Sequence, residues 1–312
     1  MKKIITSSIA VAALAVMTTS AALADGAACK TVKFSDVGWT DITSTTAATS
    51  LVLKALGYNP TTQILSVPVT YASMKNKDID VFLGNWMPSM AGDSDPYTKA
   101  GTVKTLSVNL KGAKYTLAVP SYVADAGVKS FADLAKNKDK FSGKFYGIEP
   151  GNDGNRLIQD MIDKNSFDLK GWKVVESSEQ GMLSQVARAS RTKDWIVFLG
   201  WAPHPMNANF KLTYLSGGDD FFGPNYGGAD VYTQTRAGLA ADCPNLGMLL
   251  SNLRFSLPME NEIMGMILDD GMTPEKAAAK YLKANAGMID GWIKGVKTFD
   301  GGDAAAAVKK AL

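Results

Sequence analysis

Three tryptophans stand where strands are expected to end, and with one tyrosine they are the residues best suited to binding chemistry. Trp39, Trp86 and Trp201 each follow a glycine by one or two residues. A glycine at such a turn lets the backbone change direction sharply and leaves the indole face open. Tyr115 begins a further expected strand, where the chain is expected to cross between two lobes. We therefore expect these four rings to enclose one pocket.

A cage of aromatic faces is suited above all to a quaternary ammonium ion. Such a cation has no hydrogen to donate and spreads its charge over methyl groups, so ring quadrupoles can replace its hydration. Each cation–π contact contributes about 0.5–2 kcal/mol, so four rings contribute roughly 2–8 kcal/mol. Micromolar binding requires about 8 kcal/mol. A polar group is therefore expected to add to the cage.

Two polar residues near the rings are candidates for that role. Asp41, two residues after Trp39, could face the cation or bind a ligand hydroxyl, or it could cap a helix expected to begin near Thr43. Asn152 can both donate and accept hydrogen bonds, although asparagine beside glycine is also common in turns. The backbone N–H groups of the same loop are an alternative site for an anion such as a ligand carboxylate.

Strands alternate with helical segments along the chain, which predicts an α/β fold with largely parallel strands. In such sheets, ligands bind beyond the carboxyl ends of the strands, where the three tryptophans are expected. The other tryptophans are interpreted as core residues: Trp172, Trp195 and Trp292. The longer strands are expected at 32–37, 64–67, 81–83, 115–119, 145–148 and 195–199, and the longer helices at 43–56, 156–164, 178–189 and from 259 onward.

The first residues have the order of a secretory signal peptide. Two lysines precede an apolar stretch at 9–17, and Ala22–Ala24 matches an A-x-A cleavage site. Residues 1–24 are therefore predicted to be removed by cleavage after Ala24. A membrane span needs roughly 20 apolar residues, and neither this stretch nor any other comes close to that length.

Charge and composition exclude several classes of partner and site. The formal net charge is +3 and no basic run is visible, so nucleic acid is not an expected partner. With two cysteines and one histidine, a Cys/His zinc site is excluded, and no metal or cofactor is expected. Cys29 and Cys243 either form a disulfide in an oxidising compartment or remain two buried thiols.

Five segments closely resemble the choline-binding periplasmic proteins of bacterial ABC importers, which belong to the wider glycine betaine/choline-binding family. The resemblance extends over essentially the whole chain after the signal peptide, and the combination of motifs is specific. The segments are Asp36–Asp41, Gly84–Pro88, Lys114–Leu117, Glu149–Arg156 and Gly200–Pro205.

The resemblance implies a type II periplasmic-binding-protein fold, in which two α/β lobes are joined by two crossings and the ligand lies in the cleft between them. Lobe I is expected to contain residues 25–113 and 214–312, and lobe II residues 114–213. The protein is expected to be a periplasmic monomer, without enzymatic activity, that captures choline or acetylcholine and delivers it to an ABC permease.

The resemblance also implies roles for particular residues. In that family an aromatic box holds the cation, and an acid and an amide hold the ligand hydroxyl. A disulfide is implied as well, between Cys29 and Cys243. The corresponding ligand-binding residues here are Trp39, Trp86, Tyr115 and Trp201 for the box, and Asp41 and Asn152 for the hydroxyl.

Two other functions fit parts of the sequence. A glycine betaine or carnitine receptor is the first, but those ligands carry a carboxylate that Asp41 would repel. A secreted choline-ester hydrolase is the second. The chain has no G-x-S-x-G motif, and its single histidine, His204, lies between two prolines, a stiff setting for a catalytic base.

Overall fold

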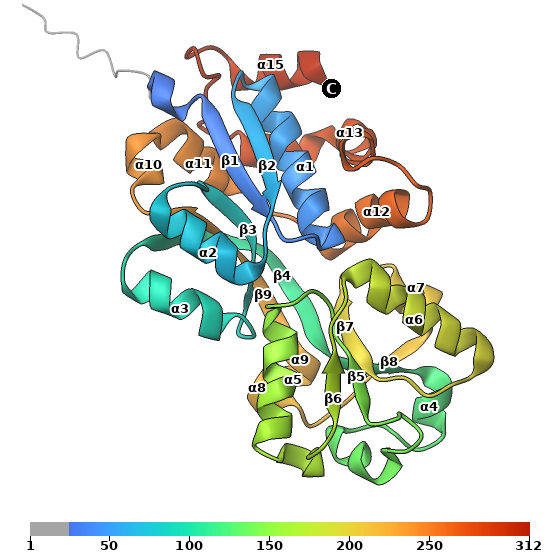
Figure 1. The fold of residues 1–312 in the computed structure, drawn as a ribbon. Coiled ribbons are helices and arrows are strands. Elements are labelled where there is room, and N and C mark those ends of the chain that lie inside the picture. Colours follow the sequence, from blue (N-terminus) through green and yellow to red (C-terminus); the bar gives the residue numbers. More distant parts are fainter. Residues whose placement is uncertain (1–24) are drawn as a thin grey trace, which may run out of the picture.

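The chain folds into two α/β lobes that are connected by long strands (Figure 1). This computed structural model describes residues 25–312, so the predicted signal peptide at 1–24 lies outside the described residues. Among residues 25–312, no helix is long and apolar enough to cross a membrane. Within the same range, no group of three or more His, Cys, Asp or Glu side chains is placed to hold a metal ion.

The first lobe is built from the elements at both ends of the described chain. The central strands β1 and β3 pair in parallel, and β2 lies at the edge beside β1. The N-terminal elements are β1 (Thr31–Asp36), α1 (Thr40–Ala55), β2 (Asn59–Ile64), α2 (Val67–Asn76), β3 (Val81–Met87) and α3 (Ala91–Lys99). The C-terminal elements are α10 (Leu239–Asp242), α11 (Pro244–Asn252), α12 (Leu257–Leu268), α13 (Pro274–Ala284), α14 (Ile289–Trp292) and α15 (Ala304–Ala311).

The second lobe contains the middle of the chain. Its strand β5 pairs in parallel with both β6 and β7. The elements are α4 (Ser121–Asp125), β5 (Lys144–Tyr146), α5 (Asp153–Asp163), β6 (Lys173–Val175), α6 (Glu179–Thr192), β7 (Phe198–Ala202), α7 (Met206–Asn209), β8 (Leu212–Tyr214), α8 (Asp219–Phe222) and α9 (Pro224–Gly227).

Two long strands, β4 (Val103–Pro120) and β9 (Gly228–Arg236), connect the lobes. They pair antiparallel with each other, β9 pairs antiparallel with β3, and β4 pairs antiparallel with β7. The sheet is therefore mixed, with parallel pairs inside each lobe and antiparallel pairs at the crossing. The expectation of largely parallel strands was wrong for the crossing. Helices α8 and α9 lie beside second-lobe elements in Figure 1, although they fall in the range 214–312 predicted for lobe I. Because β4 and β9 run between the lobes, the lobe bounds at 113/114 and 213/214 remain predictions.

Several elements differ from their predicted positions, among them a strand and a helix of the first lobe. The strand expected at 64–67 lies at Asn59–Ile64, because this edge strand is mostly polar and exposed and so lacks the apolar pattern of a buried strand. Helix α1 begins at Thr40 rather than near residue 43. Asp41 therefore lies in the first turn of the helix and not at its N-cap, so the capping alternative does not apply, and a ligand-binding role for Asp41 stays a prediction.

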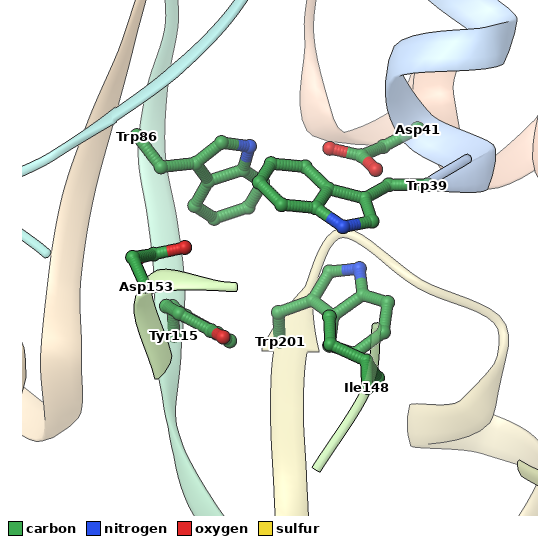
Figure 2. Close-up of a pocket in the computed structure, with 7 residues that line it drawn as sticks. All are labelled: Trp39, Asp41, Trp86, Tyr115, Ile148, Asp153 and Trp201. Carbon is green, nitrogen blue, oxygen red and sulfur yellow. The ribbon is translucent and has the colours of Figure 1, made fainter. Parts of the chain in front are cut away.

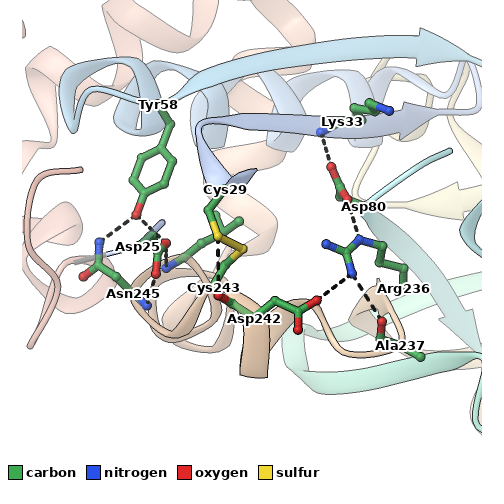
Figure 3. The surroundings of a disulfide bond; sticks show 11 residues. Asp25, Cys29, Lys33, Tyr58, Asp80, Arg236, Ala237, Asp242, Cys243 and Asn245 are labelled. Atoms are coloured by element: carbon green, nitrogen blue, oxygen red, sulfur yellow. Dashed lines mark hydrogen bonds and ion pairs between the residues drawn. A yellow bond between two sulfur atoms is a disulfide. The ribbon is translucent and has the colours of Figure 1, made fainter. Parts of the chain in front are cut away.

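The two cysteines form a disulfide that connects residues 214 positions apart (Figure 3). The Cys29–Cys243 prediction is confirmed. Beside the bond, the carboxylate of Asp25 accepts hydrogen bonds from the backbone N–H groups of Asn245 and Leu246, at the start of α11. It also accepts one from the hydroxyl of Tyr58. A helix N-terminus favours such an anion, so the first described residues are held firmly against the C-terminal part of the first lobe.

Candidate functional site

A pocket between the two lobes is lined almost entirely by aromatic and acidic side chains (Figure 2). The empty space inside it is about 270 Å³, including the part that opens to solvent. Such a space can enclose only a small molecule. The lining residues are Trp39, Asp41, Trp86, Tyr115, Ile148, Asp153 and Trp201.

The sheet places three of the four rings. Tyr115 on β4 lies directly opposite Trp201 on β7 in the antiparallel register, and residues opposite each other project from the same face. Their ring centroids are 6.4 Å apart, and that of Trp86 on β3 is 6.2 Å from Tyr115. All four rings, Trp39 included, are at most 6% exposed. Protein therefore encloses the four rings almost completely, and all four line the pocket.

Tyr115 is positioned by the loop that begins α5. Its hydroxyl donates to Oδ1 of Asn152 (2.8 Å), and that oxygen also accepts from the backbone N–H groups of Gly154 and Asn155. Gly154 is required here because a Cβ at this position would lie 2.0 Å from the Tyr115 hydroxyl. Asn152 thus caps the helix and orients a ring of the pocket at once.

Trp39 is positioned by a carboxylate from the other lobe. Its indole Nε1 lies 3.0 Å from both oxygens of Glu149, which precedes α5. Glu149 in turn accepts a hydrogen bond from Nδ2 of Asn152 (3.1 Å). One polar chain therefore connects Trp39 through Glu149 and Asn152 to Tyr115, and it forms only when the lobes are together.

A second contact between the lobes joins the start of α1 to the start of α6. Glu179 accepts hydrogen bonds from the backbone N–H (2.8 Å) and the hydroxyl of Thr40. Helix α1 has no side-chain cap of its own, so Glu179 satisfies one of its free N–H groups from across the cleft. An oxygen of Glu179 also lies 3.2 Å from Nε2 of His204. The His204 ring packs edge-on against Trp201, with 4.9 Å between the ring centroids.

Two carboxyl groups in the pocket have no partner. Asp41 and Asp153 are each 1% exposed, and neither oxygen of either residue has a hydrogen bond among the described residues. The hydroxyl of Ser89, a neighbour of Asp153, donates to the backbone carbonyl of Trp86 and not to that carboxyl group. Burial, reinforced by Glu179, raises the pKa of Asp41 to about 8, and burial raises the pKa of Asp153 to about 6. Since a buried charge is costly without a partner, the pocket favours a cation.

The structure brings together most of the residues that the sequence singled out. Trp39, Trp86, Tyr115, Trp201 and Asp41 all line one pocket between the lobes. Asn152 does not line it, because its side chain is engaged behind the Tyr115 ring. Sequence reasoning missed Asp153 and Ile148 in the lining, and Glu149 and Glu179 behind it. Asp153 follows Asn152 directly in a motif that was noticed, which was the available signal.

A family model described as the substrate-binding domain of ABC-type glycine betaine transport systems (OpuAC) matches residues 30–284. The chain belongs to this family. Its members are binding components of transport systems rather than enzymes.

Solved structures of similar proteins share both fold and much of the sequence. An ABC-transporter choline binding protein in complex with choline is 65% identical, with a TM-score of 0.90, covering 91% of this chain and 98% of the other. An ABC-transporter choline binding protein in an unliganded semi-closed conformation is also 65% identical, with a TM-score of 0.84, covering 91% of this chain and 99% of the other. Lactococcal OpuAC, closed around glycine betaine, is 28% identical, with a TM-score of 0.76 and coverage of 84% and 99%.

These comparisons confirm the type II periplasmic-binding-protein fold with two lobes. The geometry of His204 agrees with a family of binding proteins, because this histidine is not free to act as a catalytic base. Its Nδ1 accepts from the backbone N–H of Met206 (2.9 Å), and its Nε2 faces Glu179. Both ring nitrogens therefore contact protein groups, and neither is exposed to a substrate.

We predict that Glu179→Ala weakens cation binding at least tenfold, because Thr40 loses its partner across the cleft and a smaller closed fraction lowers the apparent affinity. Calorimetric titration with tetramethylammonium, the simplest quaternary ammonium, measures the change. Small-angle scattering of the unliganded variant should show a larger radius of gyration. Glu262→Ala, an exposed substitution on α12, is the control. Unchanged affinity with Glu179→Ala would show that this contact does not stabilise closure.

We also predict a pH-dependent stability that originates in the first lobe. Glu260 on α12 is 2% exposed, and its burial and the nearby Asp41 raise its pKa well above the usual value. A carboxyl with a raised pKa in the folded state keeps its proton while the unfolded chain loses it. Its contribution to stability is full at and below about pH 4 and is lost as pH rises toward the folded pKa.

The expected result is that Glu260→Gln reduces the fall in unfolding free energy with rising pH by up to about 1.4 kcal/mol per pH unit. Denaturant unfolding between pH 5 and pH 9 measures the slope. Glu262→Gln, exposed on the same helix, should leave it unchanged. The same slope in Glu260→Gln and wild type would contradict the assignment.

Proposed function

We propose that this protein captures choline in the pocket between its lobes and delivers it to the permease of an ABC importer. The observation that carries the proposal is a cage of four aromatic rings that also contains two buried carboxyl groups without partners. Among the seven lining residues, all within residues 25–312, none is basic. The site therefore supplies ring faces and negative charge, the two features that a methylated ammonium requires.

The energetics fit a ligand that carries a full charge. Four desolvated cation–π contacts contribute roughly 2–8 kcal/mol, while closing the lobes has a cost. A carboxylate near the cation supplies the rest, because an ion pair in a water-excluded pocket is stronger than one at the surface. A neutral ligand would leave that carboxylate unpaired and would bind poorly.

Choline fits this pocket better than glycine betaine. Betaine carries a carboxylate, and in a pocket of this size that group would lie close to Asp41 or Asp153. Of the two similar structures with a bound ligand, the 65% identical one contains choline and the 28% identical one contains glycine betaine. The choline hydroxyl can instead form a hydrogen bond with a carboxyl group. Acetylcholine remains a second ligand of the same class.

Several assignments from the resemblance are part of the proposal. Trp39, Trp86, Tyr115 and Trp201 form the box for the cation, and Asp41 binds the hydroxyl. Asn152 can reach the ligand only through its second amide hydrogen, since Oδ1 is fully engaged and the other hydrogen bonds Glu149. We further propose that the chain is exported and cleaved after Ala24. The mature protein is then a periplasmic monomer.

Calorimetric titration with choline and glycine betaine tests the proposed function. We expect choline to bind with micromolar or better affinity, and betaine at least tenfold more weakly, because zwitterionic betaine has no net charge to balance an ionised acid of the pocket. Tighter binding of betaine would contradict the assignment of choline as the ligand. If neither compound binds, the proposed function is wrong. Acetylcholine recovered intact after long incubation with the protein would support binding without hydrolysis.

The aromatic box is tested by Trp201→Ala. We expect choline affinity to fall at least tenfold, because one desolvated ring contributes about 2 kcal/mol. Trp195→Ala is the matched control, since Trp195 is partly buried in the same lobe but does not line the pocket. An equal effect of the two substitutions would assign the loss to folding rather than to the box.

A further inference from the structure

The two unpartnered carboxyl groups approach the pocket from different sides (Figure 2). Asp153, the first residue of α5, lies between Trp86 and Tyr115 with its carboxyl directed into the space between the rings. Asp41, in the first turn of α1, lies on the side of Trp39. Both groups are 1% exposed and have no hydrogen bond among the described residues, so each is available to a ligand.

A choline molecule carries one positive charge and one hydroxyl group, so it can balance only one ionised carboxylate. Two buried carboxylates facing one cation would leave an uncompensated negative charge, which is strongly unfavourable in a pocket closed to water. One of the two acids must therefore keep its proton. A protonated carboxyl can donate a hydrogen bond as well as accept one, which suits a hydroxyl group.

The surroundings determine which acid is ionised. Of the charged neighbours of Asp153, Asp93 disfavours its carboxylate and Arg156, one turn further along α5, favours it; these two neighbours form an ion pair at 2.8 Å. The charged neighbours that act on Asp41, by contrast, are the acids Glu179 and Asp36. Each aspartate lies in the first turn of its helix, so the helix dipoles do not distinguish them.

We propose that Asp153, as a carboxylate, is the counter-ion of the quaternary ammonium, and that Asp41, as a neutral acid, binds the hydroxyl group. This inference rests on the proposed function, since it assigns the two ends of choline within the same pocket. It adds Asp153 to the binding residues and gives Asp41 a protonated state. The raised pKa of Asp41, about 8 against about 6 for Asp153, agrees with that order.

Three ligands separate the two roles. Choline carries both the charge and the hydroxyl, ethyltrimethylammonium carries only the charge, and 3,3-dimethyl-1-butanol carries only the hydroxyl on a neutral frame of the same shape. Their affinities for wild type, Asp153→Asn and Asp41→Asn are measured by calorimetry or by tryptophan fluorescence. Asp160→Asn, a change on α5 at a side chain that is 45% exposed, is the control and should leave all three affinities unchanged.

Asp153→Asn should weaken choline and ethyltrimethylammonium by the same factor, at least thirtyfold, and should largely remove the preference for choline over the neutral alcohol. Asp41→Asn should instead reduce the preference for choline over ethyltrimethylammonium at least fivefold, and keep the preference for cations. Circular dichroism and the unfolding midpoint show whether each variant folds. If Asp153→Asn does not fold, Asp153→Ser, which keeps a residue suited to a helix start, takes its place.

A reversed pattern, with charge discrimination lost in Asp41→Asn and kept in Asp153→Asn, would overturn the assignment while leaving choline capture intact. So would an Asp153→Asn variant with wild-type affinity for all three compounds. Wild-type protein that binds none of them would overturn the proposed function together with this inference.

Discussion

The central constraint on the proposed function is that a methylated cation can leave water only if ring faces and negative charge surround it. No single loop can supply that enclosure. Trp39 belongs to the first lobe and Trp201 to the second, while Trp86 and Tyr115 come from strands at or beside the crossing. The pocket is therefore complete only when the lobes are together, and ligand capture and lobe closure are one process.

The contacts that hold the lobes together lie directly behind the rings. Glu149 binds the indole N–H of Trp39, and Glu179 connects Thr40 to the histidine that packs on Trp201. Each contact bridges more than a hundred residues of sequence. Because the same side chains orient the rings and join the lobes, a loss of ring geometry is also a loss of closure.

Buried acids in the cleft have an energetic cost that the ligand removes. Burial raises the pKa of Asp41, Glu149 and Asp153, because it disfavours their ionised forms. A bound cation stabilises the ionised form of an acid that faces it, so the ligand makes closure of the lobes more favourable. The disulfide and the Asp25 contacts lie in the first lobe, away from the pocket, and stabilise the frame rather than the site.

The sequence by itself determined the lobed α/β class, the disulfide and five of the seven lining residues, because Trp, Gly and Asp at strand ends follow local rules of turn and strand. It left open whether Asp41 binds a ligand or caps a helix, and it missed Asp153, Glu149 and Glu179. Those roles depend on burial and on partners in the other lobe, as with Thr40 and Glu179, 139 residues apart. Only the tertiary structure decides them, because the protonation state of a carboxyl group follows from what surrounds it in space.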